Sequence, residues 1–288
     1  MSNLSTQSSK PESISWCNGR WGSAKELGVP LSDRGLLLAD GLFETVLVQA
    51  GKPRLLEDHL QRWQTSAALL AMAPPPEADW LKGLITEAID RCGLSGEGNE
   101  CSGALRLNWS RGDGDGRGIE LPTAATDPSQ HRFWLTLQHH TPTFSPVRCW
   151  ISRHERRNAT SQLSRCKTFA YGQAIQARRE ARTHGADDAL LLSSKGDLCC
   201  GSTANLLVLR QGTWITPPLS SGCLPGIMRA RALTQPNANE EPLGTQPQPG
   251  DQWLLINSLG CRPLAQVDDQ PLNVNVASAQ ALWRNLLD

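Results

Sequence analysis

The sequence predicts an α+β fold with two domains, and three observations support this prediction. The chain has 288 residues, of which 39% are hydrophobic, and this is enough to bury one large core or two of ordinary size. Short apolar and β-branched runs are mixed with only a few stretches in which apolar residues follow a helical periodicity. A glycine-rich and polar stretch at 110–130 interrupts the pattern near the middle of the chain. We therefore expect two layered units that are joined there.

The expected domain organisation follows from composition. Residues 1–14 are rich in Ser, Thr, Gln and Pro, so they are predicted to form a flexible tail. A smaller N-terminal α/β domain is expected over 15–122 and a larger C-terminal domain over 131–288. Residues 123–130 are the predicted linker between them.

The N-terminal domain is predicted to contain a β-hairpin, two helices and a further strand. Apolar positions three or four apart indicate the helices, and Pro74 ends the first of them. Alternation of apolar and polar residues indicates the last strand. The expected ranges are 41–48 and 54–56 for the hairpin, 55–72 and 79–91 for the helices, and 104–109 for the strand.

The C-terminal domain is predicted to add strands and one long helix. Helical spacing ends just before Gly185, a typical helix-terminating residue. Residues 235–250 contain Gln, Pro, Asn and Glu in quick succession, which is typical of an exposed loop. The expected strands are 132–137, 189–193 and 205–209, and the expected helix is 168–183.

The composition favours a small-molecule enzyme of the cytoplasm. Lysine plus arginine and aspartate plus glutamate both number 28, so nothing indicates nucleic acid or an anionic membrane as a partner. No apolar run approaches membrane-spanning length, and the polar first residues do not look like a secretion signal. The 9 cysteines lack the repeated spacing of a zinc site, so we expect reduced thiols and no metal.

Lys167 is the first candidate catalytic residue. It lies just before the predicted helix at 168–183, and beyond residue 150 only Lys195 is a second lysine. The positive end of a helix dipole and partial burial both disfavour the ammonium form, which leaves an amine able to attack a carbonyl. Taken alone, a solvated surface lysine is the commoner situation.

Several separated motifs resemble those of class IV aminotransferases and their lyase relatives. They cover nearly the whole chain: Ser-Asp-Arg-Gly at 32–35 with its continuation to Thr45, His-Leu-Gln-Arg-Trp at 59–63, Cys-Lys-Thr-Phe-Ala-Tyr at 166–171, the stretch 196–206, and Leu-Pro-Gly-Ile-Met-Arg at 224–229. The resemblance implies a two-domain fold with mixed sheets and a barrel-like larger domain. It also implies pyridoxal 5'-phosphate as cofactor and a homodimer with active sites near the subunit interface.

The resemblance assigns roles to individual residues. Lys167 would form the Schiff base with the cofactor, and Arg62 would give the cofactor phosphate two parallel charge-assisted hydrogen bonds. Tyr171, the only tyrosine, would contact the phenolic oxygen. Without the family, each of these residues has an ordinary structural explanation as a surface, core or turn residue. The full set of implied cofactor contacts is Arg62, Lys167, Tyr171, Cys200, Thr203, and the backbones of Ile227 and Met228.

Cys200 occupies the position where the family pattern has a glutamate for the pyridine nitrogen. A carboxylate keeps that nitrogen protonated, whereas a thiol is a weak hydrogen-bond partner, so the cofactor would be a weaker electron sink. This favours elimination driven by ring aromatisation over transamination. The alternative is that Cys200 is a small buried residue, with another acid serving the nitrogen or with activity impaired.

Two further segments favour the lyase branch of the family. Residues 110–119 resemble its glycine-rich active-site loop, and 257–264 resemble its substrate-side loop. The implied activity is release of pyruvate and 4-aminobenzoate from 4-amino-4-deoxychorismate, a step of folate biosynthesis, with Arg117, Asn257 and Ser258 as candidates for binding substrate carboxylates. A D-amino-acid or branched-chain aminotransferase, or a cofactor-binding protein with little activity, remain alternatives.

Overall fold

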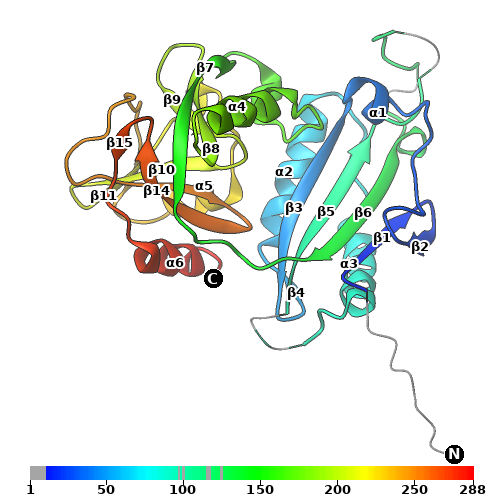
Figure 1. Cartoon of the computed structure of the whole chain (residues 1–288). Coiled ribbons are helices and arrows are strands. Elements are labelled where there is room, and N and C mark those ends of the chain that lie inside the picture. Colours follow the sequence, from blue (N-terminus) through cyan, green and yellow to red (C-terminus); the bar gives the residue numbers. More distant parts are fainter. Residues whose placement is uncertain (1–10, 97, 99–100, 115–117, 124–125) are drawn as a thin grey trace, which may run out of the picture.

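The computed structural model describes residues 11–96, 98, 101–114, 118–123 and 126–288. The chain forms two lobes, each built on its own β-sheet, and helix α4 (Gly172–Thr183) lies near the top of the second lobe beside the first (Figure 1). The fold is α+β with mixed sheets, which confirms the predicted fold class.

The first lobe contains a six-stranded antiparallel sheet in the order β2-β1-β6-β5-β3-β4. Helices α2 and α3 pack against one of its faces and bury Trp63 and Ile85 against the strand residues Leu105 and Leu135. The element bounds are β1 Ser13–Cys17, β2 Arg20–Gly22, α1 Arg34–Leu38, β3 Gly41–Gln49, β4 Lys52–Pro53, α2 Leu56–Leu69, α3 Ala78–Cys92, β5 Ser102–Ser110, η1 Pro128–Gln130 and β6 Arg132–His139.

The second lobe contains a nine-stranded mixed sheet in the order β12-β11-β10-β13-β14-β7-β8-β9, with β15 beside β14. An additional pairing of Asn205 with Cys200 joins β10 to β9, so six of these strands close into a barrel-like ring. The remaining bounds are β7 Val147–Arg157, η2 Gln162–Arg165, β8 Asp188–Ser193, β9 Leu198–Gly201, β10 Asn205–Arg210, β11 Thr213–Thr216, η3 Leu219–Ser221, α5 Ile227–Leu233, β12 Ala238–Glu240, β13 Gln252–Asn257, β14 Gly260–Val267, β15 Gln270–Pro271 and α6 Val276–Asn285.

The change from one sheet to the other does not occur at the predicted linker. Strand β6 pairs with β1 and β5, so it is a strand of the first sheet rather than the start of the second domain. Residues 123–130 therefore belong to the connection between two strands of one sheet. The chain crosses to the second lobe between β6 and β7. The predicted tail is also too long, because β1 already begins at Ser13; residues 1–10 of that tail lie outside the described residues.

Three local predictions are wrong for identifiable reasons. Leu55 is not extended but has a φ of +53° and caps α2, so the second hairpin strand is only two residues long. The helix expected from residue 168 begins at Gly172, because the preceding residues pair with β3. The loop expected at 235–250 contains β12 and the fully buried Leu243.

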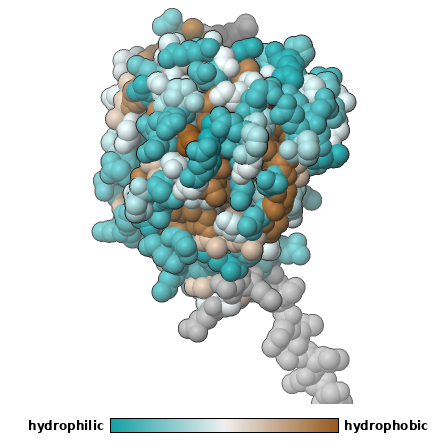
Figure 2. All heavy atoms as spheres, turned by 90° about the vertical axis from the view of Figure 1, so that its left-hand side faces the viewer, coloured by the Kyte–Doolittle hydropathy of each residue, from teal (hydrophilic) through white to brown (hydrophobic). Residues whose placement is uncertain are grey.

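Among the described residues, no helix combines the length and the apolar character needed to cross a bilayer. The face shown in Figure 2 is mostly hydrophilic, with apolar side chains in patches toward its middle and right.

Candidate active site

A cavity of about 340 Å³ is lined by residues of both lobes. The first lobe contributes residues of α2, β3 and β5, and the second contributes residues of β9, α5 and the turn between β13 and β14. The structure brings most of the predicted site residues to this cavity, whereas Arg117 lies outside the described residues. Those that line it are Arg62, Lys167, Tyr171, Cys200, Thr203, Ile227, Met228, Asn257 and Ser258.

Lys167 is held by strand pairing and not by a helix entrance. Its carbonyl accepts a hydrogen bond from the N–H of Phe43 at 2.9 Å, and α4 begins only at Gly172, so the predicted helix-dipole effect is wrong. The Lys167 Nζ lies 3.1 Å from the hydroxyl of Tyr171 and 4.3 Å from the centre of the Phe43 ring. Within the described chain no carboxylate forms an ion pair with Lys167, so the amine is available to a ligand.

Arg62 lines the cavity and forms an ion pair with the buried carboxylate of Glu44. Its Nε and Nη2 donate to the two carboxylate oxygens of Glu44 at 2.8 and 2.5 Å, and its Nη1 donates to the Pro225 carbonyl at 3.1 Å. Burial alone would raise the pKa of Glu44, but the Arg62 charge and hydrogen bonds from His59 and Arg62 lower that pKa to about 2. Since a guanidinium carries five N–H groups, one on each terminal nitrogen remains for an anion.

The turn that precedes α5 lies beside Arg62 and is braced by Asn205. The amide of Asn205 donates to the Leu224 carbonyl at 2.9 Å. A Cβ on Gly226 would lie 2.0 Å from the Asn205 side-chain oxygen, so only glycine fits. The N–H groups of Ile227 and Met228 begin the helix and lack intrahelical acceptors. We call Glu44, Arg62, Asn205 and Gly226 the anion end of the cavity.

Cys200 also lines the cavity, where it pairs with Asn205 across two strands and lies beside the thiol of Cys199. The β8–β9 register shifts between Leu191 and Leu192, which leaves Cys199 as an extra residue beside Cys200. Hydrogen bonds of Cys199 with Cys200 and Cys223, together with burial, raise the pKa of Cys199. We call Cys199, Cys200 and Cys223 the thiol end. Among the described residues that line the cavity there is no Asp or Glu, so none of them can replace the missing glutamate.

Among the described residues, four cationic side chains line the cavity: Arg62, Arg106, Arg157 and Lys167. Arg106 was not predicted, although alternation along β5 puts it opposite the buried Leu105 and Leu107. Its guanidinium lies 3.5 Å from the centre of the Phe43 ring, its Nε donates to Asn108 at 2.7 Å, and burial lowers the pKa of Arg106. This lining attracts anions.

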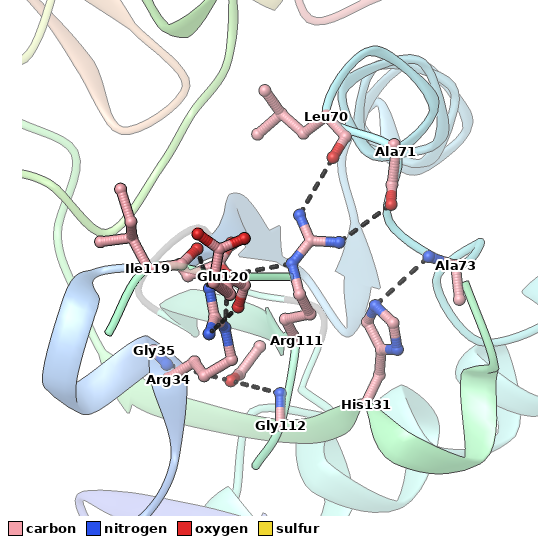
Figure 3. Close-up of polar contacts among 12 residues, drawn as sticks. Arg34, Gly35, Leu70, Ala71, Ala73, Arg111, Gly112, Ile119, Glu120 and His131 are labelled. Carbon is pink, nitrogen blue, oxygen red and sulfur yellow. Dashed lines mark hydrogen bonds and ion pairs between the residues drawn. The ribbon is translucent and has the colours of Figure 1, made fainter. Parts of the chain in front are cut away.

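The described parts of the predicted glycine-rich loop are anchored on the first lobe and do not line the cavity. Arg34 and Arg111 both donate through Nε to one oxygen of Asp40, at 2.8 and 2.9 Å. Figure 3 shows how their other nitrogens reach backbone carbonyls. Those carbonyls belong to Ile119 and Glu120 for Arg34, and to Leu70 and Ala71 for Arg111. A substrate contact by Arg117 stays a prediction.

Fold and site together define a two-lobed α+β protein in which Lys167 and Arg62 line one cavity. A family model described as "Amino-transferase class IV" matches residues 41–267. The chain therefore belongs to the class IV aminotransferase family, for which pyridoxal phosphate is the expected cofactor.

Individual relatives carry more than one activity in their names. The chain is 27% identical over 206 residues to the "Bifunctional aminodeoxychorismate lyase / D-amino acid transaminase" of Mycobacterium tuberculosis, covering 66% of this chain and 65% of that protein. It is 26% identical to the "Aminodeoxychorismate lyase" of Bacillus subtilis, covering 74% and 70%. A solved fold IV transaminase of Curtobacterium pusillum, 25% identical, superposes with a TM-score of 0.80 over 96% of this chain and 98% of that one.

Proposed function

We propose that this chain is a pyridoxal-phosphate-dependent lyase that converts 4-amino-4-deoxychorismate to pyruvate and 4-aminobenzoate. Two of the relatives above carry that activity in their names. The cavity also fits the cofactor chemically, because Arg62 has two N–H groups left for a phosphate and donates a further one to the Pro225 carbonyl in the turn before α5. Tyr171, Thr203, Ile227 and Met228 are the further proposed cofactor contacts.

The observation that carries the lyase proposal is the charge of the lining. The described lining contains four cations and no carboxylate, and the proposed substrate carries two carboxylates. Arg106 has an uncharged hydrogen-bond partner in Asn108, so we assign it to a substrate carboxylate, with Asn257 and Ser258 nearby in the same lining. Cys200 in place of an acid weakens electron withdrawal through the cofactor ring, which disfavours transamination more than an elimination that creates an aromatic ring.

The residues of the chain have distinct tasks in this reaction. Pyridoxal phosphate, when bound, supplies an aldehyde for the substrate amine and a ring that withdraws electrons. Lys167 Nζ takes the ring proton next to that amine, and the Tyr171 hydroxyl at 3.1 Å orients the lysine. The carbon–oxygen bond to the enolpyruvyl group then breaks. A proton returned to that group gives pyruvate, and the ring leaves as 4-aminobenzoate.

The test is an assay of the purified protein with aminodeoxychorismate, made from chorismate and glutamine by a synthase, without any keto acid. We expect equal amounts of pyruvate and 4-aminobenzoate. Lys167→Ala should lower the rate about 1,000-fold or more, and borohydride should fix the cofactor to Lys167 only in the unmodified protein. Lys195→Ala is the matched control, because Lys195 is exposed and outside the cavity.

Two other outcomes would replace the proposal. Amino transfer from a D-amino acid or a branched-chain amino acid, without 4-aminobenzoate, would make the chain an aminotransferase. Cofactor fixed to Lys167 without turnover of either kind of substrate would make it a binding protein with little activity.

Assembly and location also belong to the proposal. We propose a homodimer, supported by the exposed apolar side chains Leu36, Leu37, Leu163 and Ile175, of which Leu163 also lines the cavity. We propose a cytoplasmic location, supported by the free thiols of all 9 cysteines.

A further inference from the structure

A buried hydrogen-bonded chain connects the ion pair of the anion end to the cavity surface. His59 Nδ1 lies 2.8 Å from a carboxylate oxygen of Glu44, and His59 Nε2 lies 3.2 Å from the hydroxyl oxygen of Ser258. His59 and Glu44 are each 1% exposed, whereas Ser258 lines the cavity. The three residues come from α2, β3 and the turn between β13 and β14, so this series of hydrogen bonds connects the two lobes.

The charge of Glu44 determines where one of the protons lies. The pKa of Glu44 is about 2, so at neutral pH its oxygens only accept hydrogen bonds, and His59 Nδ1 must be the donor. When the imidazole is neutral, Nε2 has a lone pair and the Ser258 hydroxyl donates to it. The hydroxyl oxygen then presents only lone pairs to the cavity, which repel an anion.

Protonation of the imidazole reverses the direction of the hydrogen bond between His59 Nε2 and the Ser258 hydroxyl. Nε2 then donates to the Ser258 oxygen, and the hydroxyl proton is free to point into the cavity. Glu44 of β3 and Ser258 of the second lobe are the direct hydrogen-bond partners of the His59 ring. Arg62, which lies on the same helix as His59, influences the ring through its ion pair with Glu44. Within the described chain, Glu44 is the only acidic ion-pair partner of His59.

Charge balance links the two arrangements to ligand binding. Glu44 is already paired with Arg62, so an anion that enters the cavity leaves a surplus of negative charge, which a positive imidazole would balance. An anion beside Arg62 adds negative charge and an acceptor for the Ser258 hydroxyl, and both favour the protonated imidazole.

We propose that binding of a tetrahedral dianion beside Arg62 is coupled to the uptake of one proton by His59, with the Ser258 hydroxyl as the relay. His59 is thus a positioning residue that acts through Ser258. The inference rests on the anion end of the proposed function but not on the lyase reaction.

Inorganic sulfate is the appropriate probe, because it stays a dianion between about pH 6 and 9 and any proton taken up must be bound by the protein. The cofactor-free full-length chain is titrated with sulfate in two buffers of different ionisation enthalpy. We expect measurable proton uptake of up to one per sulfate bound, and affinity that falls as pH rises, at most about tenfold per pH unit. No uptake and no pH dependence would overturn the proposal.

Variants of Ser258 and His59 test whether the proton is taken up through the relay and not at another group such as Lys167. In Ser258→Ala we expect weaker sulfate binding with a flattened pH dependence, whereas Ser258→Thr, which keeps the hydroxyl, should retain the slope. His59→Gln should also lose the pH dependence of sulfate affinity. Because His59 is buried, the two Ser258 variants provide the test if this variant does not fold. A slope in Ser258→Ala equal to that of the unmodified chain would refute the relay.

The outcomes also separate this proposal from the proposed function. Absence of sulfate binding at every pH would remove the anion end itself and both proposals with it. Coupled proton uptake without 4-aminobenzoate formation would leave the relay intact and reject only the lyase.

Discussion

The anion end and the thiol end of the cavity differ in the charge and hydrogen bonding of their side chains. At the anion end, the charges of Arg62 and Glu44 are paired, and Glu44 is buried almost completely. At the thiol end, Cys200 shares a hydrogen bond with the thiol of Cys199, and its exposed fraction is 8%. We therefore expect a change at the anion end to reduce stability and ligand binding, and a change at the thiol end to alter which reaction is favoured.

Removal of Glu44 should have the largest effect on the molecule. Glu44→Ala leaves Arg62 with an unpaired charge beside buried His59, and breaking a buried pair in this way costs about 3–5 kcal/mol of unfolding free energy. Urea unfolding measures the loss. Glu57→Ala is the matched control, because Glu57 pairs with Lys82 at 2.8 Å on the surface, with side chains 72% and 46% exposed. That change should cost about 0–1 kcal/mol.

Acid titration of stability gives an independent check on Glu44. Its pKa is lowered in the folded chain to about 2, so the pair stabilises the fold fully above the ordinary pKa of a glutamate, and this contribution is lost as pH falls toward 2. The difference in unfolding free energy between the unmodified chain and Glu44→Gln should therefore shrink between about pH 5 and pH 2. A difference that is constant over this range would show that Glu44 is not held ionised by its partners.

The sequence predicted which residues line the cavity better than it predicted the contacts that hold them in place. Lys167 and Arg62 could be identified because short motifs around them are local in sequence. Arg106 was missed because an arginine on an alternating strand is usually solvated, and only the packing of β5 beside β3 puts it against Phe43. Asn205 was missed as a brace because its partner Leu224 is a distant turn residue.

Long-range pairing also explains the errors in the fold. The polar stretch before β6 indicates a surface connection, but composition does not say which sheet the next strand joins. Phe133, Leu135 and Leu137 complete the first core, and this decides the membership of β6. In the same way, pairing with β3 delays the start of α4 to Gly172, since the residues around Thr168 are held extended.

Arg106→Gln should have an intermediate effect that is confined to substrate. Loss of one charge-assisted contact to a carboxylate costs about 1.5–3 kcal/mol, so kcat/KM for aminodeoxychorismate should fall about 10- to 100-fold, mostly through KM. Affinity for pyridoxal phosphate should not change. Arg148→Gln is the control, because Arg148 is 55% exposed and makes a longer contact of 3.8 Å with Asp187. An equal loss of cofactor affinity would assign Arg106 to the cofactor instead.

The smallest expected effect, and the one that tests the thiol end most directly, is that of Cys200→Glu. A carboxylate there would keep the cofactor ring nitrogen protonated and strengthen electron withdrawal, which helps amino transfer more than an elimination driven by aromatisation. We expect amino transfer from D-alanine to rise about tenfold, a change of about 1.4 kcal/mol in the barrier, while lyase activity changes less. Cys200→Ser, which preserves size without adding charge, should leave the ratio of the two activities unchanged. If Cys200→Glu raised both activities equally, the thiol would not be what favours elimination, and the charge of the cationic lining would have to account for that preference alone.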